Sequence, residues 1–373
     1  MKILMVSMNN LHFRRWSEQL RDSGLEVFWF DILDQGYAPS MSWMSQITGW
    51  KKGFLKRRGR TFLKKQIPKL YKMLETKYDV PVAEAFEQVL LTINPDVVHS
   101  FALQIGCLPI LSVMNDHQNF KWIYSSWGSD LYNRKNKPEY LKEVPAVLMR
   151  VDYLFTDCKR DYNIAQSQGF NGVYLGTFPG GGGFEPRVVE MERKTNNSFA
   201  LKAYQNDLGR AITALEALYE VYKLNNEISV YCFGASPDFF QHLKNNDYPA
   251  NFLREVHEIL SYEKVMQLME RCDFYIGNSI SDGIPNTMIE AMFCGCIPIQ
   301  SNPGEATAEL IEHGINGWLI NAPENKSQLI ELICNVLVFD KKRMRNCILK
   351  TITSLNRNSI KNEVLNSYKN TIG

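Results

Sequence analysis

The chain contains 373 residues, of which 45% are hydrophobic and 22% charged, and its formal net charge is +2. One hydrophobic core rarely organises so long a chain, and about 150 residues per domain predicts two domains. The composition is typical of a globular protein and excludes wholesale disorder. No segment reaches the roughly 18 to 20 consecutive apolar residues of a membrane-spanning helix. The eight cysteines include no C-x-x-C pair, so we expect no zinc site.

Basic residues gather in residues 51–65, which hold eight Lys and Arg side chains with Phe and Leu between them. Trp43 and Trp50 lie just upstream. Cations mixed with large apolar side chains predict contact with an anionic membrane surface. The alternative is a solvated helix or loop whose cations meet only water and counterions. Nucleic acid is not an expected partner.

The first half of the sequence alternates apolar strands with helical stretches. Residues 1–8 are too short an apolar run for a signal peptide and predict a buried strand, so we expect a cytoplasmic protein. Residues 12–23 predict a helix that ends at Gly24. Further strands are expected at 26–30, 95–100, 122–126 and 153–156. Strands that alternate with helices predict a parallel, doubly wound α/β sheet.

A glycine-rich stretch, 178–185, interrupts this alternation and continues as a polar run to Asn197. Four consecutive glycines are also compatible with a phosphate-binding loop, but no Lys-Ser/Thr pair follows them and no helix begins there. We therefore interpret the stretch as a linker. The predicted domains are residues 1–180 and 195–350, and a final helix within 351–373 is expected to cross back to the first domain.

The alternation restarts after the linker and predicts a second domain of nucleotide-binding type. Strands are expected at 198–204, 228–233, 273–277, 297–300 and 317–320, and helices at 208–222, 262–271, 286–293 and from 327 onwards.

The densest chemical signal lies where the strand 273–277 leads through a glycine-containing turn into the helix 286–293. Ligands of open α/β sheets bind at the carboxyl ends of the strands, and a helix N-terminus offers N–H groups to a phosphate. Asp282 and Glu290 are eight residues apart, so both carboxylates can address one ligand. The alternative is that Asp282 merely ends the strand and Glu290 lies on a solvated helix face.

The stretch Asp282-Gly283-Ile284-Pro285, followed by Glu290-Ala291-Met292, Gly295 and Pro298, resembles the retaining glycosyltransferases of family 4. The resemblance spans about residues 198–322. It implies the GT-B fold, in which two Rossmann-like, doubly wound parallel-sheet domains face a cleft. It also implies that Asp282 holds hydroxyls of a donor sugar and that Glu290 holds the ribose of the nucleotide. Gly283 and the amides of Asn286, Thr287 and Met288 would contact the sugar or phosphate.

A departing nucleoside diphosphate needs positive charge, from a metal or from fixed cations. The chain has no D-x-D motif, so we expect no metal and no cofactor. Lys202 and Arg210 stand where the family has an Arg and a Lys, in inverted order. The alternative is that both are surface cations at element ends.

In the first domain, Ser126-Trp127-Gly128-Ser129-Asp130 resembles the family's H-G-x-D segment, with Trp127 in place of His. Asp130 is a candidate catalytic residue that positions a hydroxyl or balances charge on the sugar; a helix cap is an equal alternative. Asn10 and His12 follow the first strand and are candidates for the acceptor side. His99 is expected to be a core histidine.

These patterns predict a metal-independent, retaining glycosyltransferase of the hexosyl or N-acetylhexosaminyl class. Its donor would be a nucleotide sugar, and its acceptor a lipid-linked glycan of surface polysaccharide synthesis at the inner face of the membrane. A sugar-nucleotide epimerase and a non-catalytic binding subunit of a polysaccharide assembly complex remain alternatives.

Overall fold

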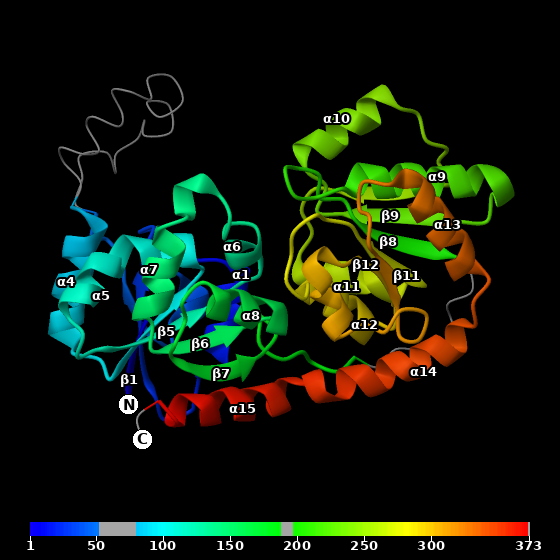
Figure 1. Ribbon diagram of the computed structural model, residues 1–373. Coiled ribbons are helices and arrows are strands. Elements are labelled where there is room, and N and C mark those ends of the chain that lie inside the picture. The colour runs from blue at the N-terminus through cyan, green and yellow to red at the C-terminus, as the bar shows by residue number, and fades with distance from the viewer. Residues whose placement is uncertain (52–79, 188–196, 372–373) are drawn as a thin grey trace. The chain divides into compact units, whose positions relative to one another are not determined.

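The computed structural model describes residues 1–51, 80–187 and 197–371, which form two compact units (Figure 1). The first unit contains residues 1–156, 164–176 and 363–371, and the second contains 157–163 and 177–362. Most of the predicted basic segment 51–65 lies outside the described residues. The expected division at 180–195 differs from the observed one, because residues 157–163 pack with the second unit.

The first unit is built on a seven-stranded sheet with the order β3-β2-β1-β4-β5-β6-β7. Its strands are β1 (Lys2–Ser7), β2 (Glu26–Asp31), β3 (Ser45–Ile47), β4 (Val97–Phe101), β5 (Lys121–Ser125), β6 (Tyr153–Thr156) and β7 (Val173–Thr177). The pairs from β3 to β6 are parallel. Ile3 to Val6 are fully buried, because helices cover both faces of such a sheet and its strands become continuous apolar runs.

Helices of this unit are α1 (Leu11–Glu18), α4 (Val82–Ile93), α5 (Leu111–Asp116), α6 (Ser129–Tyr132), α7 (Glu143–Arg150) and the last four residues of α8 (Lys159–Ser167). The helix predicted at 12–23 ends early, at Glu18, and is followed by turns. Trp50 stacks on buried Phe30 with ring centroids 5.3 Å apart, and its indole N–H donates to the carbonyl of Asp31 at 2.8 Å. The Trp50 ring therefore packs against the core of the first unit.

The second unit repeats the plan with a six-stranded, parallel sheet in the order β10-β9-β8-β11-β12-β13. Its strands are β8 (Ser198–Lys202), β9 (Ser229–Phe233), β10 (Leu253–His257), β11 (Phe274–Gly277), β12 (Ile297–Ser301) and β13 (Trp318–Ile320). In both sheets the strand order reverses beside the first strand, which is the switch point where doubly wound folds bind ligands.

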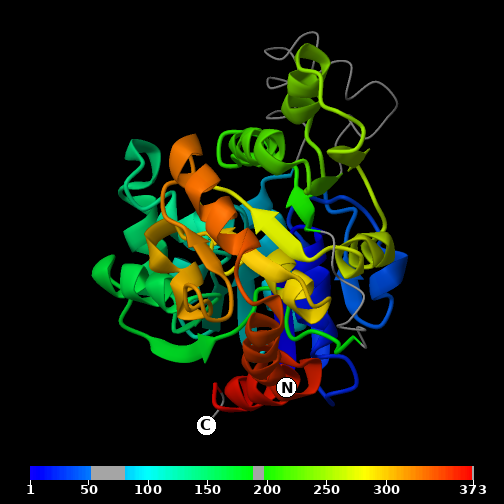
Figure 2. The same cartoon turned by 90° about the vertical axis from the view of Figure 1, so that its right-hand side faces the viewer.

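Helices of the second unit are α9 (Ala211–Asn225), α10 (Pro237–Asn245), α11 (Tyr262–Glu270), α12 (Asn286–Phe293), α13 (Lys326–Leu337) and α14 (Lys341–Ile352). Helices α9 and α13 pack together on one face of the sheet, and α11 and α12 lie on the other (Figures 1 and 2). Side-chain caps begin several of these helices, for example Ser236 before α10 and Ser261 before α11.

The glycine-rich linker is packed, with Gly183 directly against the backbone of Arg357. A Cβ on Gly183 would lie 2.4 Å from the Cα of Arg357, so only glycine fits there. Next to it, the Phe184 amide donates to the carbonyl of Leu355, and the Arg357 amide donates to the carbonyl of Phe184. The linker therefore pairs with the chain where α15 (Arg357–Lys369) begins.

The last turns of α15 belong to the first unit. The Tyr368 side chain is fully buried, and its hydroxyl lies 2.6 Å from His99 Nδ1 and 3.2 Å from Trp16 Nε1. His99 is also fully buried, with Nε2 2.8 Å from the Ser125 hydroxyl. Burial holds the pKa of His99 well below its usual value. His99 is therefore a core residue, as its position in the sequence predicts. Among the described residues, no helix is long and apolar enough to cross a membrane.

Candidate donor site in the second unit

The predicted donor-site residues converge at the switch point of the second sheet. Lys202 is the last residue of β8, and the turn that holds Asp282 follows β11, the strand beside β8. Parallel neighbours present their carboxyl ends at one edge of the sheet. The topology therefore brings Lys202 and Asp282 to the same edge of the sheet, although the two residues are eighty positions apart in sequence.

The charges of Asp282 and Glu290 both act on one side chain, the hydroxyl of Tyr275 on β11. Burial raises the pKa of Tyr275 well above its usual value, and the negative charges of Asp282 and Glu290 raise it further. Asp282 is partly buried, and Glu290, in the middle of α12, is only 7% exposed. The charges of Asp282 and Glu290 thus both reach one buried side chain of β11, and their action on a common ligand stays a prediction.

Several groups act on the carboxylate of Asp282. Burial raises its pKa, while the charge of Lys202, the amide of Gly283 at 3.0 Å and the charge of Arg160 each act to lower it. The amine of Lys202 is therefore near enough to stabilise the charged carboxylate. A cation and an anion that share one partly buried site can hold a polar, charged ligand between them.

Gly283 packs against a carboxylate that the sequence analysis missed. A Cβ at position 283 would lie 2.1 Å from Oδ2 of Asp157, so glycine is required for this approach. Asp157 is buried and directly follows strand β6. Like Asp282, Asp157 follows an apolar strand, but it lacks the glycine-containing turn and the spacing to a second carboxylate that identified Asp282. Sequence reasoning passed over it because nothing along the chain links Asp157 to the second unit.

The start of α12 carries the three predicted backbone contacts. Pro285 precedes the helix, and Asn286 is its first residue. The Met288 amide already donates to the carbonyl of Pro285 at 3.0 Å. The Met288 amide therefore already has a hydrogen-bond partner within the first turn. Asn286 and Thr287 are the first two residues of the helix.

Arg210 differs from Lys202 in its partners. Its Nε lies 2.7 Å from a carboxylate oxygen of Glu324, and its Nη1 donates to the carbonyls of Asn206, Asp207 and Gly209. The guanidinium is thus bound within the loop that precedes α9. A ligand phosphate would compete with Glu324 for the Nε of Arg210.

Asp130 and Asn10, both in the first unit, are engaged internally. Oδ2 of Asp130 accepts hydrogen bonds from the Leu103 amide at 2.9 Å and the Tyr124 hydroxyl at 2.6 Å, and Oδ1 accepts one from the Trp127 amide at 2.9 Å. Burial raises its pKa, and these donors oppose the rise. Asn10 caps α1 by accepting from the Phe13 amide at 2.8 Å. Both side chains thus stabilise the local structure of the first unit through these hydrogen bonds.

His12 and Trp127 are brought together at the carboxyl edge of the first sheet. His12 is exposed, and its ring centroid lies 5.7 Å from that of Trp127. His12 lies in the first turn of α1, and Trp127 lies in the loop after β5. The two rings therefore contact each other at this edge of the sheet.

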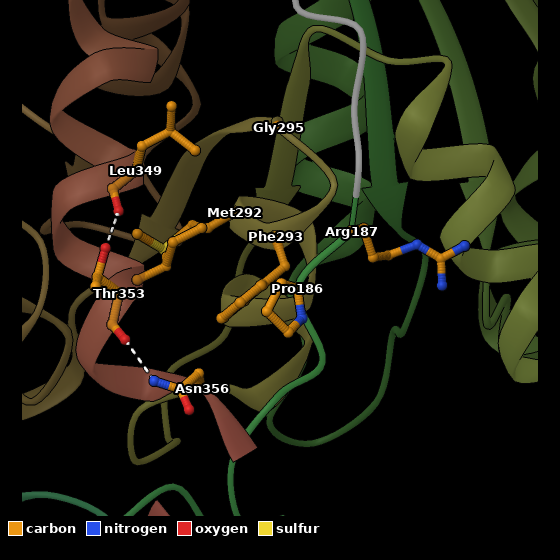
Figure 3. Close-up of a pocket in the computed structure, with 9 residues that line it drawn as sticks. Pro186, Arg187, Met292, Phe293, Gly295, Leu349, Thr353 and Asn356 are labelled. Carbon is orange, nitrogen blue, oxygen red and sulfur yellow. Dashed lines mark hydrogen bonds between the residues drawn. The ribbon is translucent and has the colours of Figure 1, made fainter. Parts of the chain in front are cut away.

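A pocket of about 400 Å³ opens at the other end of α12 (Figure 3). Met292 and Phe293, at the end of α12, line it together with Leu349 and Ile352 of α14. Among the described residues that line it, none is a predicted site residue. The cavity is mostly apolar, and neither Asp282 nor Glu290 lines it.

Ligand atoms of Asp157, Cys158 and Asp161 lie within 4.8 Å of one another, a grouping that fits a metal ion by distance alone. One oxygen of Asp161, however, accepts from Nε and Nη2 of Arg160 at 2.9 and 2.7 Å. A neighbouring guanidinium opposes cation binding, so the grouping is better described as an ion-paired cluster.

Comparison with known proteins relates the second unit to one family. Residues 204–348 match the family described as glycosyl transferases group 1. Most of the second unit is thus similar to this family, and the acidic pair, Gly283 and Arg210 lie inside the matched segment. Lys202 lies two residues before it.

The individual similarities are distant. The amylovoran biosynthesis glycosyltransferase AmsK of Erwinia amylovora is 32% identical over 77 residues, which are 19% of this chain and 18% of that protein. This match spans less than a fifth of the relative. Anabaena Alr3699/HepE in complex with UDP-glucose superimposes with a TM-score of 0.69 at 13% identity, covering 99% of this chain and 100% of that one.

The lipopolysaccharide outer core galactosyltransferase WaaB superimposes with a TM-score of 0.68 at 14% identity, over 100% of this chain and 99% of that one. Together with the two parallel sheets, these similarities identify the fold as GT-B. The predicted fold class is thereby confirmed.

Proposed function

We propose that the protein is a glycosyltransferase that moves a sugar from a nucleoside-diphosphate sugar to a hydroxyl of a glycan. The observation that carries the proposal is the convergence of Lys202, Asp282 and Glu290 at the switch point of a sheet whose sequence matches group 1 glycosyl transferases. The solved neighbour HepE was crystallised with UDP-glucose, which makes UDP the first nucleotide to test.

In the proposed reaction, the bond between the anomeric carbon and the diphosphate oxygen breaks, and its electron pair leaves with the diphosphate. The acceptor oxygen bonds to the anomeric carbon as its proton departs. Lys202 would stabilise the charge that grows on the diphosphate, because fixed cations act most strongly in a site that excludes water. Asp282 would hold sugar hydroxyls and Glu290 the ribose.

Retention of configuration and membership of family 4 belong to the proposal, and they rest on the resemblance around Asp282 and Glu290. A lipid-linked glycan of surface polysaccharide synthesis is the proposed acceptor, at the cytoplasmic face of the membrane. Its support is the basic segment 51–65 in the sequence and the similarity to proteins of amylovoran and lipopolysaccharide synthesis.

Calorimetry with UDP, GDP and ADP, and with the matching nucleosides, tests the proposal. We expect the parent to bind one nucleoside diphosphate, and Lys202→Ala to weaken that binding by about tenfold or more while barely changing affinity for the bare nucleoside, because the amine addresses phosphate. Arg210→Ala should have the smaller effect, since Glu324 already holds that guanidinium. A parent protein that binds none of these nucleotides would refute the proposed donor.

Metal independence is tested separately. We propose that the positive charge of Lys202 is enough to stabilise the departing diphosphate without a metal ion. Turnover should therefore persist in excess chelator. Activity that collapses in chelator and returns with Mn²⁺ would show that a metal carries this charge. Sugar-nucleotide hydrolysis or transfer by the pure protein would in turn exclude a non-catalytic binding subunit.

A further inference from the structure

Arg160 connects a segment from between the strands of the first sheet to the turn of the acidic pair. Its Nη1 donates to the carbonyl of Asp282 at 2.7 Å and to the carbonyl of Pro303 at 2.7 Å. Its other nitrogens bind the carboxylate of Asp161. The Arg160 side chain is 9% exposed and that of Asp161 is fully buried. The guanidinium is therefore fixed in place on both sides.

The segment that carries Arg160 is itself anchored to the second unit. The carboxylate of Glu309 accepts from the amides of Lys159 at 2.6 Å and Arg160 at 2.8 Å. These amides begin helix α8, where a carboxylate is favoured by the free N–H groups and the helix dipole. On the other side, Asp157 packs against Gly283. Residues 157–161 thus contact the turn at two adjacent residues. Arg160 reaches Asp282, and Asp157 packs against Gly283.

We infer that Arg160 is a positioning residue of the donor site, which fixes the carbonyl of Asp282 and thereby the direction of the Asp282 carboxylate. The inference rests on the proposed function for the role of that carboxylate. A charge-assisted hydrogen bond to a carbonyl is about twice as strong as a neutral one. It restrains the backbone at the residue whose side chain would hold the sugar. Misplacing a binding group by about 1 Å can lower turnover about a hundredfold.

A purely structural ion pair is the competing explanation, and the chain offers a matched control for it. Arg345 and Asp273 form an equally buried pair in the same unit, with side chains 6% and 0% exposed and 2.6 Å between nitrogen and oxygen. Arg345 also donates to a carbonyl, that of Gly295 at 3.2 Å. The hydrogen bonds of Arg345 are to Asp273 and Gly295, outside the turn of the acidic pair. Loss of either pair should lower stability, whereas only loss of Arg160 should release Asp282.

The experiment compares Arg160→Gln, Arg160→Lys and Arg345→Gln in the full chain. Hydrogen exchange is followed over 278–285, where the amides of Ser279, Ile280 and Gly283 are hydrogen-bonded. We expect Arg160→Gln to speed exchange in this peptide by about tenfold and Arg345→Gln to leave it unchanged, since opening of a local region raises exchange only there. Arg160→Lys keeps the charge but loses the planar fork, so its effect should be intermediate.

Activity gives the second readout, with UDP-sugars as donors. Arg160→Gln should raise the donor KM and lower kcat, together by about tenfold or more in kcat/KM, with the acceptor KM within twofold of the parent. Unchanged exchange over 278–285, or a donor defect no larger than that of Arg345→Gln, overturns the inference. If the parent binds no nucleoside diphosphate, the proposed function fails, and the exchange measurement still decides whether Arg160 holds the turn.

Discussion

At the residue scale, burial disfavours the charged form of the Asp282 carboxylate, which is the form that the proposed function uses. Burial raises its pKa, and Lys202, the Gly283 amide and Arg160 only partly offset this. The folded state therefore binds a proton more readily than the unfolded chain does. Between the ordinary value near 3.8 and the raised pKa, the free energy of unfolding falls as pH rises. Above the raised pKa, the full cost of burying the charge is present.

Asp282→Asn should consequently be more stable than the parent at pH 7. Asparagine keeps an oxygen for the Gly283 amide and carries no charge at any pH. The difference in melting temperature should shrink as the pH falls through the raised pKa and approach zero near pH 4. Melting curves from pH 4 to 8 measure it. A variant less stable than the parent at pH 7 would show that the attraction of the Lys202 charge outweighs burial.

The same substitution and Glu290→Gln should lower turnover. We expect losses of about ten- to a hundredfold each, because both carboxylates position the donor. Glu331→Gln, on exposed α13 surface, is the matched control. Steady-state rates on a UDP-sugar check this. Turnover within twofold of the parent for both site variants would remove the acidic pair from the mechanism.

Asp130 differs from Asp282, because both of its carboxylate oxygens accept hydrogen bonds within the first unit. Asparagine at this position would turn one oxygen into a donor that faces the Leu103 amide and Tyr124 hydroxyl or the Trp127 amide. Leaving such donors unpaired costs about 1–3 kcal/mol of unfolding free energy. Urea unfolding should show this loss for Asp130→Asn and none for exposed Asp116→Asn. Equal stability of the two variants would contradict the structural role.

At the element scale, α15 is attached to the first unit through Tyr368. Tyr368→Phe keeps the buried ring and removes only the hydroxyl that meets Trp16 and His99. We expect a loss of about 1–3 kcal/mol, because a buried indole N–H and a ring nitrogen lose their partner. Urea unfolding followed by tryptophan fluorescence measures it. Tyr37→Phe, at a residue 63% exposed, should be neutral, and similar effects of both would show that α15 contributes nothing through this contact.

At the scale of the whole molecule, membrane attachment remains a prediction from the sequence. Each cation of residues 51–65 near an anionic leaflet contributes about 1 kcal/mol, so several together would bind the protein to vesicles. The protein should sediment with anionic liposomes at 0.1 M salt, where the Debye length is about 10 Å, and be released at 1 M, where it is about 3 Å. Neutral liposomes are the control.

A charge-reversed variant locates the attachment in the basic segment. Replacing Lys56, Arg57, Arg58 and Arg60 with Glu should abolish sedimentation and spare activity on a short, water-soluble acceptor. If the parent does not bind anionic liposomes at low salt, a soluble acceptor becomes the better proposal.

By itself, the sequence determined the two parallel α/β domains and helix α12 at 286–293, and it predicts that Asp282 and Glu290 address one ligand. These features depend on apolar periodicity, turn residues and spacing within one strand-turn-helix unit, so they can be read along the chain. The short edge strands β3, β7 and β10 were missed, because their residues are only partly buried and their apolar pattern is weak.

Only the tertiary structure decided which other groups surround the acidic turn. Arg160 meets the carbonyl of Asp282 across 122 residues of sequence, and Asp157 meets Gly283 from the same segment. It also decided that Glu324 holds Arg210 and that three donors hold Asp130. No local pattern encodes these contacts, because strand order and packing, which depend on the whole chain, bring the partners together.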